Sequence, residues 1–312
     1  MSSAEWSPRI RPGKEDAPPM RIPDLLAQGS TYSFEFGPPR SPEAEVRFWR
    51  AVERLKPLNP SFVSVTYGAA GSTREGTREV VQRMAHDFGW TTMPHLSCIA
   101  HSRQDVIDIL CDYNESGCEN LLALRGDPPL DQPDLDLGDF KLAIEIVELA
   151  REHTDFAIGV AMHPEGHPAA ASAAEDREHQ AAKLRVADFG ITQSFFEAEH
   201  YLRLVEDMAA LGVDKPIIAG VIPVTNLRQA QRMTELSGGA FPSSLACDIE
   251  AVGEDRAAAR AVGVRYAAQL CRELLEARAP GLHLYTLNLS QATRELFAEL
   301  GLTRQVAPDG GP

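Results

Sequence analysis

The stretch TYSFEFGPPR, residues 31–40, sets the fold prediction, because it joins an apolar strand to an ionisable residue and an abrupt stop. Alternation along 31–36 places Ser33 and Glu35 on the opposite side from the two phenylalanines. The strand ends at two prolines, which cannot donate to a β-ladder. Burial disfavours an ionised carboxylate, so Glu35 is predicted to hold a proton near neutral pH and to act as a general acid. A purely structural ion pair with Arg40 is the alternative.

The rest of the chain repeats the pattern of a strand followed by a helix. Strands are predicted at 31–36, 62–67, 92–99, 120–124, 157–162, 189–194, 216–221 and 282–287. Helices are predicted at 42–55, 73–88, 102–116, 140–152, 175–186, 198–211, 226–236, 257–277 and 291–300. This order is typical of a (β/α)8 TIM barrel with an extra helix between strands seven and eight. A doubly wound sheet is the alternative, but no glycine-rich G-x-G-x-x-G turn follows the first strand.

Composition favours one large enzyme domain. The 312 residues are 44% hydrophobic, enough for a single large core. We expect one barrel over 21–304, a disordered extension over 1–20 and a flexible tail over 305–312. The five cysteines form no C-x-x-C pair, which favours reduced thiols over a disulfide framework or a zinc site.

Charge and hydropathy limit the partners. The net charge is −15, from 45 acidic and 30 basic residues, which argues against nucleic acid, since that polyanion is bound mainly by cations. No apolar run is long enough to span a membrane, and the start of the chain lacks the apolar core of a signal peptide. A cytoplasmic protein without a membrane partner is expected.

Polar residues lie at the carboxyl-terminal ends of the predicted strands. In a TIM barrel these ends form the face that holds the active site. These polar residues are Glu35, Thr66, His95, Arg125, Asp127, His163, Glu165, His167, Thr192, Gln193, Pro223, Thr225, Tyr285 and Asn288. Carboxylates, neutral hydrogen-bonding groups and histidines together suit a small polar heterocycle better than a phosphate. Any one of them taken alone could be a satisfied structural group.

The segment HPEGH, residues 163–167, has two histidines four residues apart, as in metal-binding H-E-x-x-H helices. Pro164 and Gly166 break such a helix, so the two rings need not converge and no metal site is predicted. The chain also lacks a serine or cysteine nucleophile elbow, so covalent acyl transfer has no support.

With the barrel in place, the chain resembles the 5,10-methylenetetrahydrofolate reductase family from about residue 30 to residue 302. The resemblance lies in seven segments in order: SFEF with PPR (33–40), FVSVTYG (62–68), PHL (94–96), LALRGD (122–127), PEGHP (164–168), ITQ (191–193) and YTLN (285–288). The family implies reduction of 5,10-methylenetetrahydrofolate to 5-methyltetrahydrofolate, a step of one-carbon metabolism toward methionine, with NADH or NADPH as the electron source.

The resemblance also implies roles for single residues. The family acid that matches Glu35 protonates the folate nitrogen whose departure opens the five-membered ring, and the resulting iminium accepts a hydride. The counterparts of Asp127 and Gln193 hold the pterin, Gln229 matches a glutamine of the substrate and nicotinamide pocket, and Tyr285 is assigned to substrate binding. Family members usually carry FAD, and the matching contact positions are Thr66, His95, Arg125, Asp127, Ala161, His163, His167, Asp176 and Lys183.

The flavin positions depart from the family pattern. Where family members usually have a tyrosine on the fifth strand, this chain has His163. Where they have a pair of basic residues that meets the FAD diphosphate, this chain has Ala182-Lys183. Leu289 stands where the family usually has an arginine, and Met233 where it usually has a phenylalanine. Compared with the family, one residue is also missing before the sixth strand. Loss of one cation beside a diphosphate removes about 1.5–3 kcal/mol. FAD binding is therefore in doubt, with a slight preference for direct hydride transfer from the nicotinamide over transfer through bound FAD.

Other functions are weaker alternatives. A pterin-dependent methyltransferase would need a zinc-binding cysteine set, and an aldolase a Schiff-base lysine at a strand end, and neither pattern is seen. A non-catalytic folate-binding barrel would keep the pterin contacts but would not need Glu35. The sequence leaves the choice of NADH or NADPH and the oligomeric state open.

Overall fold

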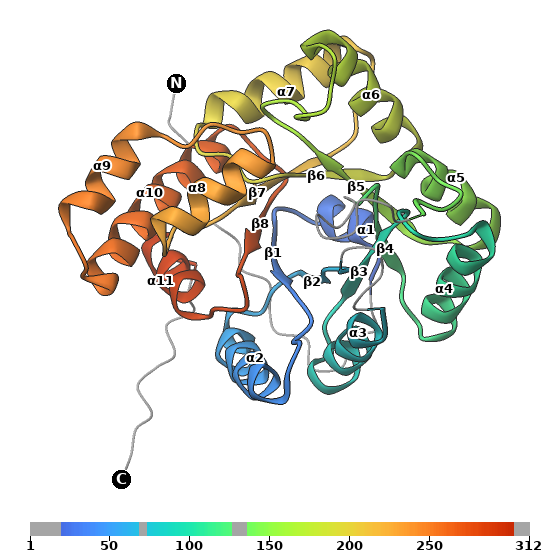
Figure 1. Cartoon of the computed structure of the whole chain (residues 1–312), viewed down its shortest axis with the longest axis horizontal. Helices are drawn as coiled ribbons and strands as arrows, with labels where there is room; N and C mark the ends of the chain where they lie inside the picture. Colours follow the sequence, from blue (N-terminus) through green and yellow to red (C-terminus); the bar gives the residue numbers. More distant parts are fainter. Residues whose placement is uncertain (1–19, 69–73, 127–135, 303–312) are drawn as a thin grey trace.

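A computed structural model describes residues 20–68, 74–126 and 136–302 of the chain. Eight parallel strands close into a barrel in the order β1-β2-β3-β4-β5-β6-β7-β8, and the helices surround it (Figure 1). The predicted TIM barrel is confirmed. The disorder predicted for 1–20 and 305–312 falls, apart from Met20, outside the described residues.

The strands are β1 (Thr31–Phe36), β2 (Phe62–Val65), β3 (Thr92–Ser97), β4 (Asn120–Leu124), β5 (Ala157–Met162), β6 (Phe189–Thr192), β7 (Ile217–Val221) and β8 (Gly281–Tyr285). The helices are α1 (Ile22–Ala27), α2 (Pro42–Leu55), α3 (Arg74–Phe88), α4 (Arg103–Glu115), α5 (Ala143–His153), α6 (Ala173–Val186), α7 (Ala198–Ala210), α8 (Leu227–Leu236), α9 (Ser243–Ala251), α10 (Arg256–Glu276) and α11 (Gln291–Glu299), with a 3-10 turn at Lys56–Leu58.

The segment between β7 and β8 differs from the prediction, because it holds two extra helices rather than one. α10 packs against β7, α7 and α11, as the seventh barrel helix should, and α8 and α9 are additions on one side of the barrel (Figure 1). α9 has nine residues, with Leu245 and Ile249 buried one turn apart. Two apolar residues are too weak a periodic signal to predict a helix of this length.

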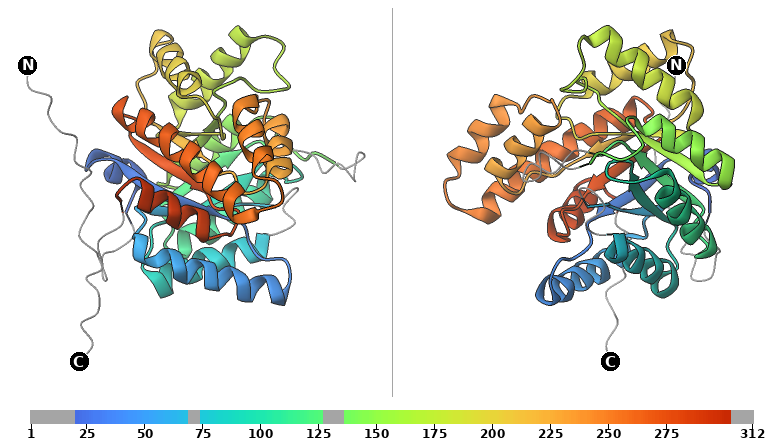
Figure 2. Two further views of the ribbon diagram at one scale, coloured as in Figure 1. Left: turned by 90° about the vertical axis from the view of Figure 1, so that its left-hand side faces the viewer. Right: turned by 45° about the vertical axis from the view of Figure 1, so that its right-hand side comes forward.

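α1 covers the amino-terminal end of the barrel (Figure 2, left). Its Ile22 and Leu25 pack into an apolar interior cluster with residues of β2, β3, β4, β6 and β7, among them Phe62, Met93 and Phe189. The helix is too short to be stable alone, so this packing holds it in place. It was not predicted, since six residues show little helical periodicity.

Asn120, at the start of β4, joins α1 to the barrel. Its Oδ1 accepts a hydrogen bond from Ile22 N at 2.7 Å, and its Nδ2 donates to Met20 O at 3.1 Å. The Asn120 side chain is 1% exposed, so these polar groups would have no access to water if their partner were removed.

None of the helices in the described part of the chain combines the length and the apolar character that crossing a membrane requires.

We predict that Asn120→Ala lowers the free energy of unfolding by about 1–3 kcal/mol, because it leaves the buried Ile22 N–H without a partner. Urea unfolding measures this change. Asn114→Ala on the exposed face of α4 is the matched control and should stay within about 0.5 kcal/mol of the parent. Equal unfolding midpoints for the two variants would refute the role of Asn120 in fixing α1.

Candidate active site

A cavity of about 330 Å³ lies at the carboxyl-terminal ends of the barrel strands. Six residues selected from the sequence line it: Glu35, Thr66, His95, Ala161, Gln193 and Tyr285. They come from separate strands or the segments directly after them, and barrel closure brings them together. None of the described residues lining this cavity is a lysine or an arginine.

Glu35 lies at the floor of the cavity between two imidazoles. Its Oε2 is 3.7 Å from His95 Nε2 and 3.7 Å from His283 Nε2. The predicted alternation is confirmed, because Ser33 also faces the interior and contacts His283. The expectation of a buried carboxyl needs correction: the Glu35 side chain is 21% exposed, since it opens onto the cavity.

His95 is a neutral neighbour of Glu35. Burial lowers its pKa to about 4, although the charge of Glu35 opposes this shift. Its Nε2 is buried and has no hydrogen-bond partner among the described residues. The ring therefore offers a polar atom toward Glu35 and the cavity floor without contributing a charge at neutral pH.

The backbone around Glu35 is held by the turn after β8. Thr286 Oγ1 donates a hydrogen bond to Glu35 O at 2.5 Å. The side-chain amide of Asn288 makes two hydrogen bonds to the backbone of Gly37: its Oδ1 accepts from Gly37 N at 2.9 Å, and its Nδ2 donates to Gly37 O at 2.8 Å. Leu287 and Asn288 have φ values of 50° and 59°, a left-handed conformation that asparagine tolerates better than leucine does. This turn therefore fixes the backbone at the end of β1, from which the Glu35 side chain extends.

Tyr285 and Gln193 form another wall of the cavity. Tyr285 Oη donates to Thr192 O at 2.5 Å, and burial together with the nearby Glu35 raises the Tyr285 pKa well above its ordinary value. Gly220 permits this contact, because a Cβ there would lie 2.2 Å from Thr192 O. The Gln193 side chain makes no hydrogen bond to another residue in the described ranges, which leaves its amide for a ligand.

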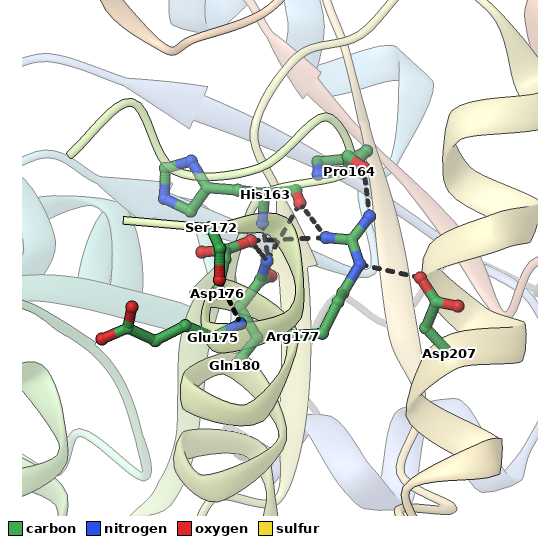
Figure 3. Close-up of polar contacts among 8 residues, drawn as sticks. All are labelled: His163, Pro164, Ser172, Glu175, Asp176, Arg177, Gln180 and Asp207. Carbon is green, nitrogen blue, oxygen red and sulfur yellow. Dashed lines mark hydrogen bonds and ion pairs between the residues drawn. The ribbon is translucent and has the colours of Figure 1, made fainter. Parts of the chain in front are cut away.

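A second polar group lies at the end of β5 and the start of α6 (Figure 3). Buried Asp176 accepts a hydrogen bond from Gln180 Nε2 at 2.6 Å, and Gln180 Oε1 accepts from His163 N at 2.7 Å. Arg177 donates to His163 O at 2.9 Å, to Pro164 O at 2.7 Å and to Asp207 Oδ2 at 2.8 Å. The contacts drawn in Figure 3 therefore hold the loop that carries His163 against α6.

The other members of this group are His167 and Lys183. The rings of His163 and His167 meet edge to face, with centroids 4.7 Å apart. Burial, with the charge of Lys183, lowers the His163 pKa to about 4. Burial lowers the Lys183 pKa to about 8, opposed by the Asp176 carboxylate. Lys183 thus remains largely charged at neutral pH, and the Asp176 carboxylate favours that charged form.

Three residues predicted for the site lie elsewhere or outside the described ranges. Arg125 is half-buried directly after β4, where its Nε donates to Gly126 O at 3.2 Å. Gln229 is exposed on α8 and is not one of the described residues lining the cavity. Asp127 lies outside the described residues.

His283 is the main residue that the sequence analysis missed. It lines the cavity with Tyr285, two residues further along the same strand. The strand period of two that grouped Ser33 with Glu35 would have placed His283 beside Tyr285. The cavity thus brings an amide, Gln193, and a carboxyl group, Glu35, to one space large enough for a small ring.

Comparison with known proteins identifies the family. The sequence model described as Methylenetetrahydrofolate reductase matches residues 21–301. The 5,10-methylenetetrahydrofolate reductase of Pectobacterium carotovorum subsp. carotovorum is 35% identical over 278 residues, which cover 88% of this chain and 91% of that protein. The probable methylenetetrahydrofolate reductase (NADH) of Oryza sativa subsp. japonica is 32% identical over 300 residues, 91% of this chain and 50% of that protein.

A solved structure gives independent support for the fold. It is an uncharacterised protein from Clostridium thermocellum that binds two copies of 5-methyl-5,6,7,8-tetrahydrofolic acid. It superposes with a TM-score of 0.63 at 13% identity and covers 90% of this chain and 96% of its own. Because the family model spans almost the whole barrel and the bacterial relative aligns along most of its length, this chain belongs to the methylenetetrahydrofolate reductase family of oxidoreductases.

Proposed function

We propose that this protein reduces 5,10-methylenetetrahydrofolate to 5-methyltetrahydrofolate, with NADH or NADPH as hydride donor and Glu35 as general acid. The observation that carries the proposal is the position of Glu35 at the floor of a cavity whose described lining contains no lysine or arginine. Relatives named as NADH-dependent reductases in rice and Arabidopsis thaliana support a pyridine nucleotide as donor.

The proposed chemistry has two balanced steps. The Glu35 carboxyl gives its proton to the bridging nitrogen as that nitrogen leaves the methylene carbon, which opens the five-membered ring and leaves an iminium. A hydride then adds to the methylene carbon and completes the methyl group, while the nicotinamide becomes oxidised. Gln193 supplies an amide that can hydrogen-bond the pterin, and Tyr285 forms the adjacent wall.

FAD, which the family usually carries, fits these residues incompletely. The ring-side positions Thr66, His95 and Ala161 line the cavity. At the β5–α6 end, however, Arg177 is committed to two carbonyls and Asp207, and the charge of Lys183 interacts favourably with the Asp176 carboxylate. A resident diphosphate, with two negative charges, would have to compete with these internal partners.

Direct hydride transfer accounts for this arrangement better than transfer through FAD. A cosubstrate that binds and leaves in each cycle tolerates weaker diphosphate contacts than a cofactor that must stay bound. With the nicotinamide and the pterin together in the cavity, the hydride passes straight to the methylene carbon. The same reaction through FAD in two half-reactions is the competing mechanism.

We predict that Glu35→Gln lowers turnover by about 100- to 10,000-fold, because the amide cannot supply the proton. Folate affinity, measured by equilibrium titration, should change little, since the amide keeps the shape of the carboxyl. Glu53→Gln, on an exposed position of α2, is the control. Undiminished turnover in the Glu35 variant would exclude the acid role and favour a non-catalytic folate-binding barrel.

We predict that demonstrably flavin-free protein oxidises NADH or NADPH when 5,10-methylenetetrahydrofolate is added, and that added FAD leaves the rate unchanged. Anaerobic stopped-flow absorbance of the nicotinamide measures both rates. Turnover that begins only after FAD is added would contradict direct transfer and restore the two half-reactions.

A companion variant checks the reason given for weak flavin binding. Ala182→Arg restores the second cation and should tighten FAD binding by about tenfold, whereas the neutral Ala182→Gln should not. Flavin fluorescence measures both affinities, and equal values for the two variants would show that charge at this position is irrelevant.

We predict that the free energy of unfolding falls on acidification in part because of His95. The unfolded chain takes up a proton below about pH 6.5, whereas the folded pKa of about 4 delays that uptake. Between pH 6.5 and pH 5 this effect costs about 2 kcal/mol, so His95→Gln should flatten the fall by that amount in urea titrations. The exposed His86→Gln is the control, and an equally steep fall in both variants would contradict a neutral His95.

A further inference from the structure

Gln193, the amide proposed to hold the pterin, directly follows the last residue of β6, so its position depends on where that strand ends. On the β5 side, a hydrogen bond from Gln193 N to Met162 O at 2.7 Å holds the segment. On the β7 side, the strand register ends at Ile191, which lies opposite Ile218. Beyond Ile191, the position of Gln193 on this side depends on contacts other than the paired strand residues.

Thr192 supplies these contacts. Its Oγ1 accepts a hydrogen bond from Gly220 N at 2.8 Å, and its carbonyl oxygen accepts one from Tyr285 Oη at 2.5 Å. A carbonyl oxygen can only accept, so the phenol is the donor and its single proton is committed to this bond. Tyr285 therefore binds the end of β6 and has no proton left to donate to a substrate.

The contact between Tyr285 and Thr192 occupies the space that a side chain at residue 220 would fill. A Cβ at Gly220 would lie 2.2 Å from Thr192 O and 2.8 Å from both Oη and Cε2 of Tyr285. These distances are well below the 3.5–4.0 Å at which carbon atoms normally make contact. Any residue larger than glycine would therefore displace the phenol from the Thr192 carbonyl.

The Tyr285 side chain links the surroundings of Glu35 to those of Gln193. Its backbone pairs with Glu35 in the register of β1 and β8, and its hydroxyl binds the carbonyl directly before Gln193. The ring meets His283 edge to face, with centroids 5.5 Å apart, and packs against the apolar cluster that includes Phe196. A tyrosine side chain bends at only two torsions, so one that is held at both ends acts as a rigid spacer.

We propose that Tyr285 is a positioning residue for the pterin: its hydroxyl fixes the Thr192 carbonyl beside Gly220 and so holds the Gln193 amide in place relative to Glu35. This inference rests on the proposed function, in which Gln193 binds the pterin and Glu35 protonates it. The Tyr285 hydroxyl serves the protein itself, while the ring remains a wall of the cavity.

A double-mutant cycle tests whether Tyr285 acts through Gln193. Tyr285→Phe deletes one oxygen and keeps the ring, so it should weaken binding of 5-methyltetrahydrofolate by about three- to tenfold in equilibrium titrations. In a Gln193→Ala background the same substitution should change the affinity by less than about twofold, because the amide that it positions is gone.

Three results of this cycle would overturn the proposal. Equal losses in the two backgrounds would mean that Tyr285 contacts the ligand independently of Gln193. An unchanged affinity in Tyr285→Phe alone would mean that the hydroxyl positions nothing. An unchanged affinity in Gln193→Ala alone would mean that no pterin contact exists there to be positioned.

Steady-state kinetics give a second readout. In Tyr285→Phe the KM for 5,10-methylenetetrahydrofolate should rise by about three- to tenfold, whereas the KM for NADH or NADPH should stay within about twofold, because Gln193 is assigned to the pterin. A general disturbance of the cavity would raise both constants alike, and that result would contradict the positioning role.

Tyr266→Phe is the matched control. Tyr266 lies on α10, packs against the same apolar cluster as Tyr285 and is not among the described residues that line the cavity. This variant removes the same oxygen, yet its folate affinity should equal that of the parent. A loss as large as that of Tyr285→Phe would show that the effect is not specific to the Thr192 contact and would refute the inference.

Gly220→Ala tests the space beside the contact. It should weaken folate binding at least as much as Tyr285→Phe does, because the added methyl group displaces the phenol. Urea unfolding establishes whether the variant folds, and parent affinity in a folded Gly220→Ala protein would overturn the proposal. If this variant does not fold, the double-mutant cycle of Tyr285 and Gln193 decides alone.

Failure of the proposed function is distinguishable from failure of this inference. If Glu35→Gln retains turnover, the proposed acid role fails. Binding of 5-methyltetrahydrofolate needs no turnover, so the coupling between Tyr285 and Gln193 is still measured. Coupled losses then support the positioning role, independent losses overturn it, and a parent protein that binds no folate would overturn both proposals.

Discussion

The pairing of β1 with β8 is the interaction on which the site depends. These strands are about 250 residues apart in the chain, and their register sets Ser33 opposite His283 and Glu35 opposite Tyr285. The same pairing closes the barrel and sets which residues of β1 and β8 lie beside the Glu35 carboxyl. The turn after β8 adds a second connection, because Asn288 and Thr286 bind the backbone of β1 at Gly37 and Glu35. Glu35 is thus held through both its backbone and its neighbours.

The barrel interior changes character along its axis. At the amino-terminal end it is apolar, where α1 covers the cluster that contains Phe62, Met93 and Phe189. Above this cluster lies a layer of serine and histidine side chains, and above that layer lies the cavity. Buried polar groups are costly unless they pair with one another, and the Ser33–His283–Ser64 contacts meet that requirement. The apolar cluster thus borders the polar layer on one side, and Glu35 lies on the other side of that layer, 3.7 Å from His283.

The positions of the charged residues bear on whether the protein can retain FAD. The chain has a net charge of −15, and at the end of β5 and the start of α6 two of its cations interact with groups of the protein itself. Arg177 fixes the loop after β5, and the Asp176 carboxylate favours the charged form of Lys183. The described lining of the cavity has one carboxyl group and no lysine or arginine. Such an environment suits a proton transfer coupled to a hydride better than firm retention of a dianionic cofactor, which is the physical basis of the proposed direct transfer.

The sequence by itself determined the barrel, the strand order and the inward direction of Ser33 and Glu35, because alternation and strand–helix periodicity are local properties that burial enforces. It also identified six of the residues that line the cavity, since strand ends converge in any closed barrel. Only the tertiary structure showed α1, α9 and the enclosure of His283 by Ser33 and Ser64. Short helices carry too few residues for a periodic signal, and contacts across 250 positions depend on the register of strands that pair only when the barrel closes.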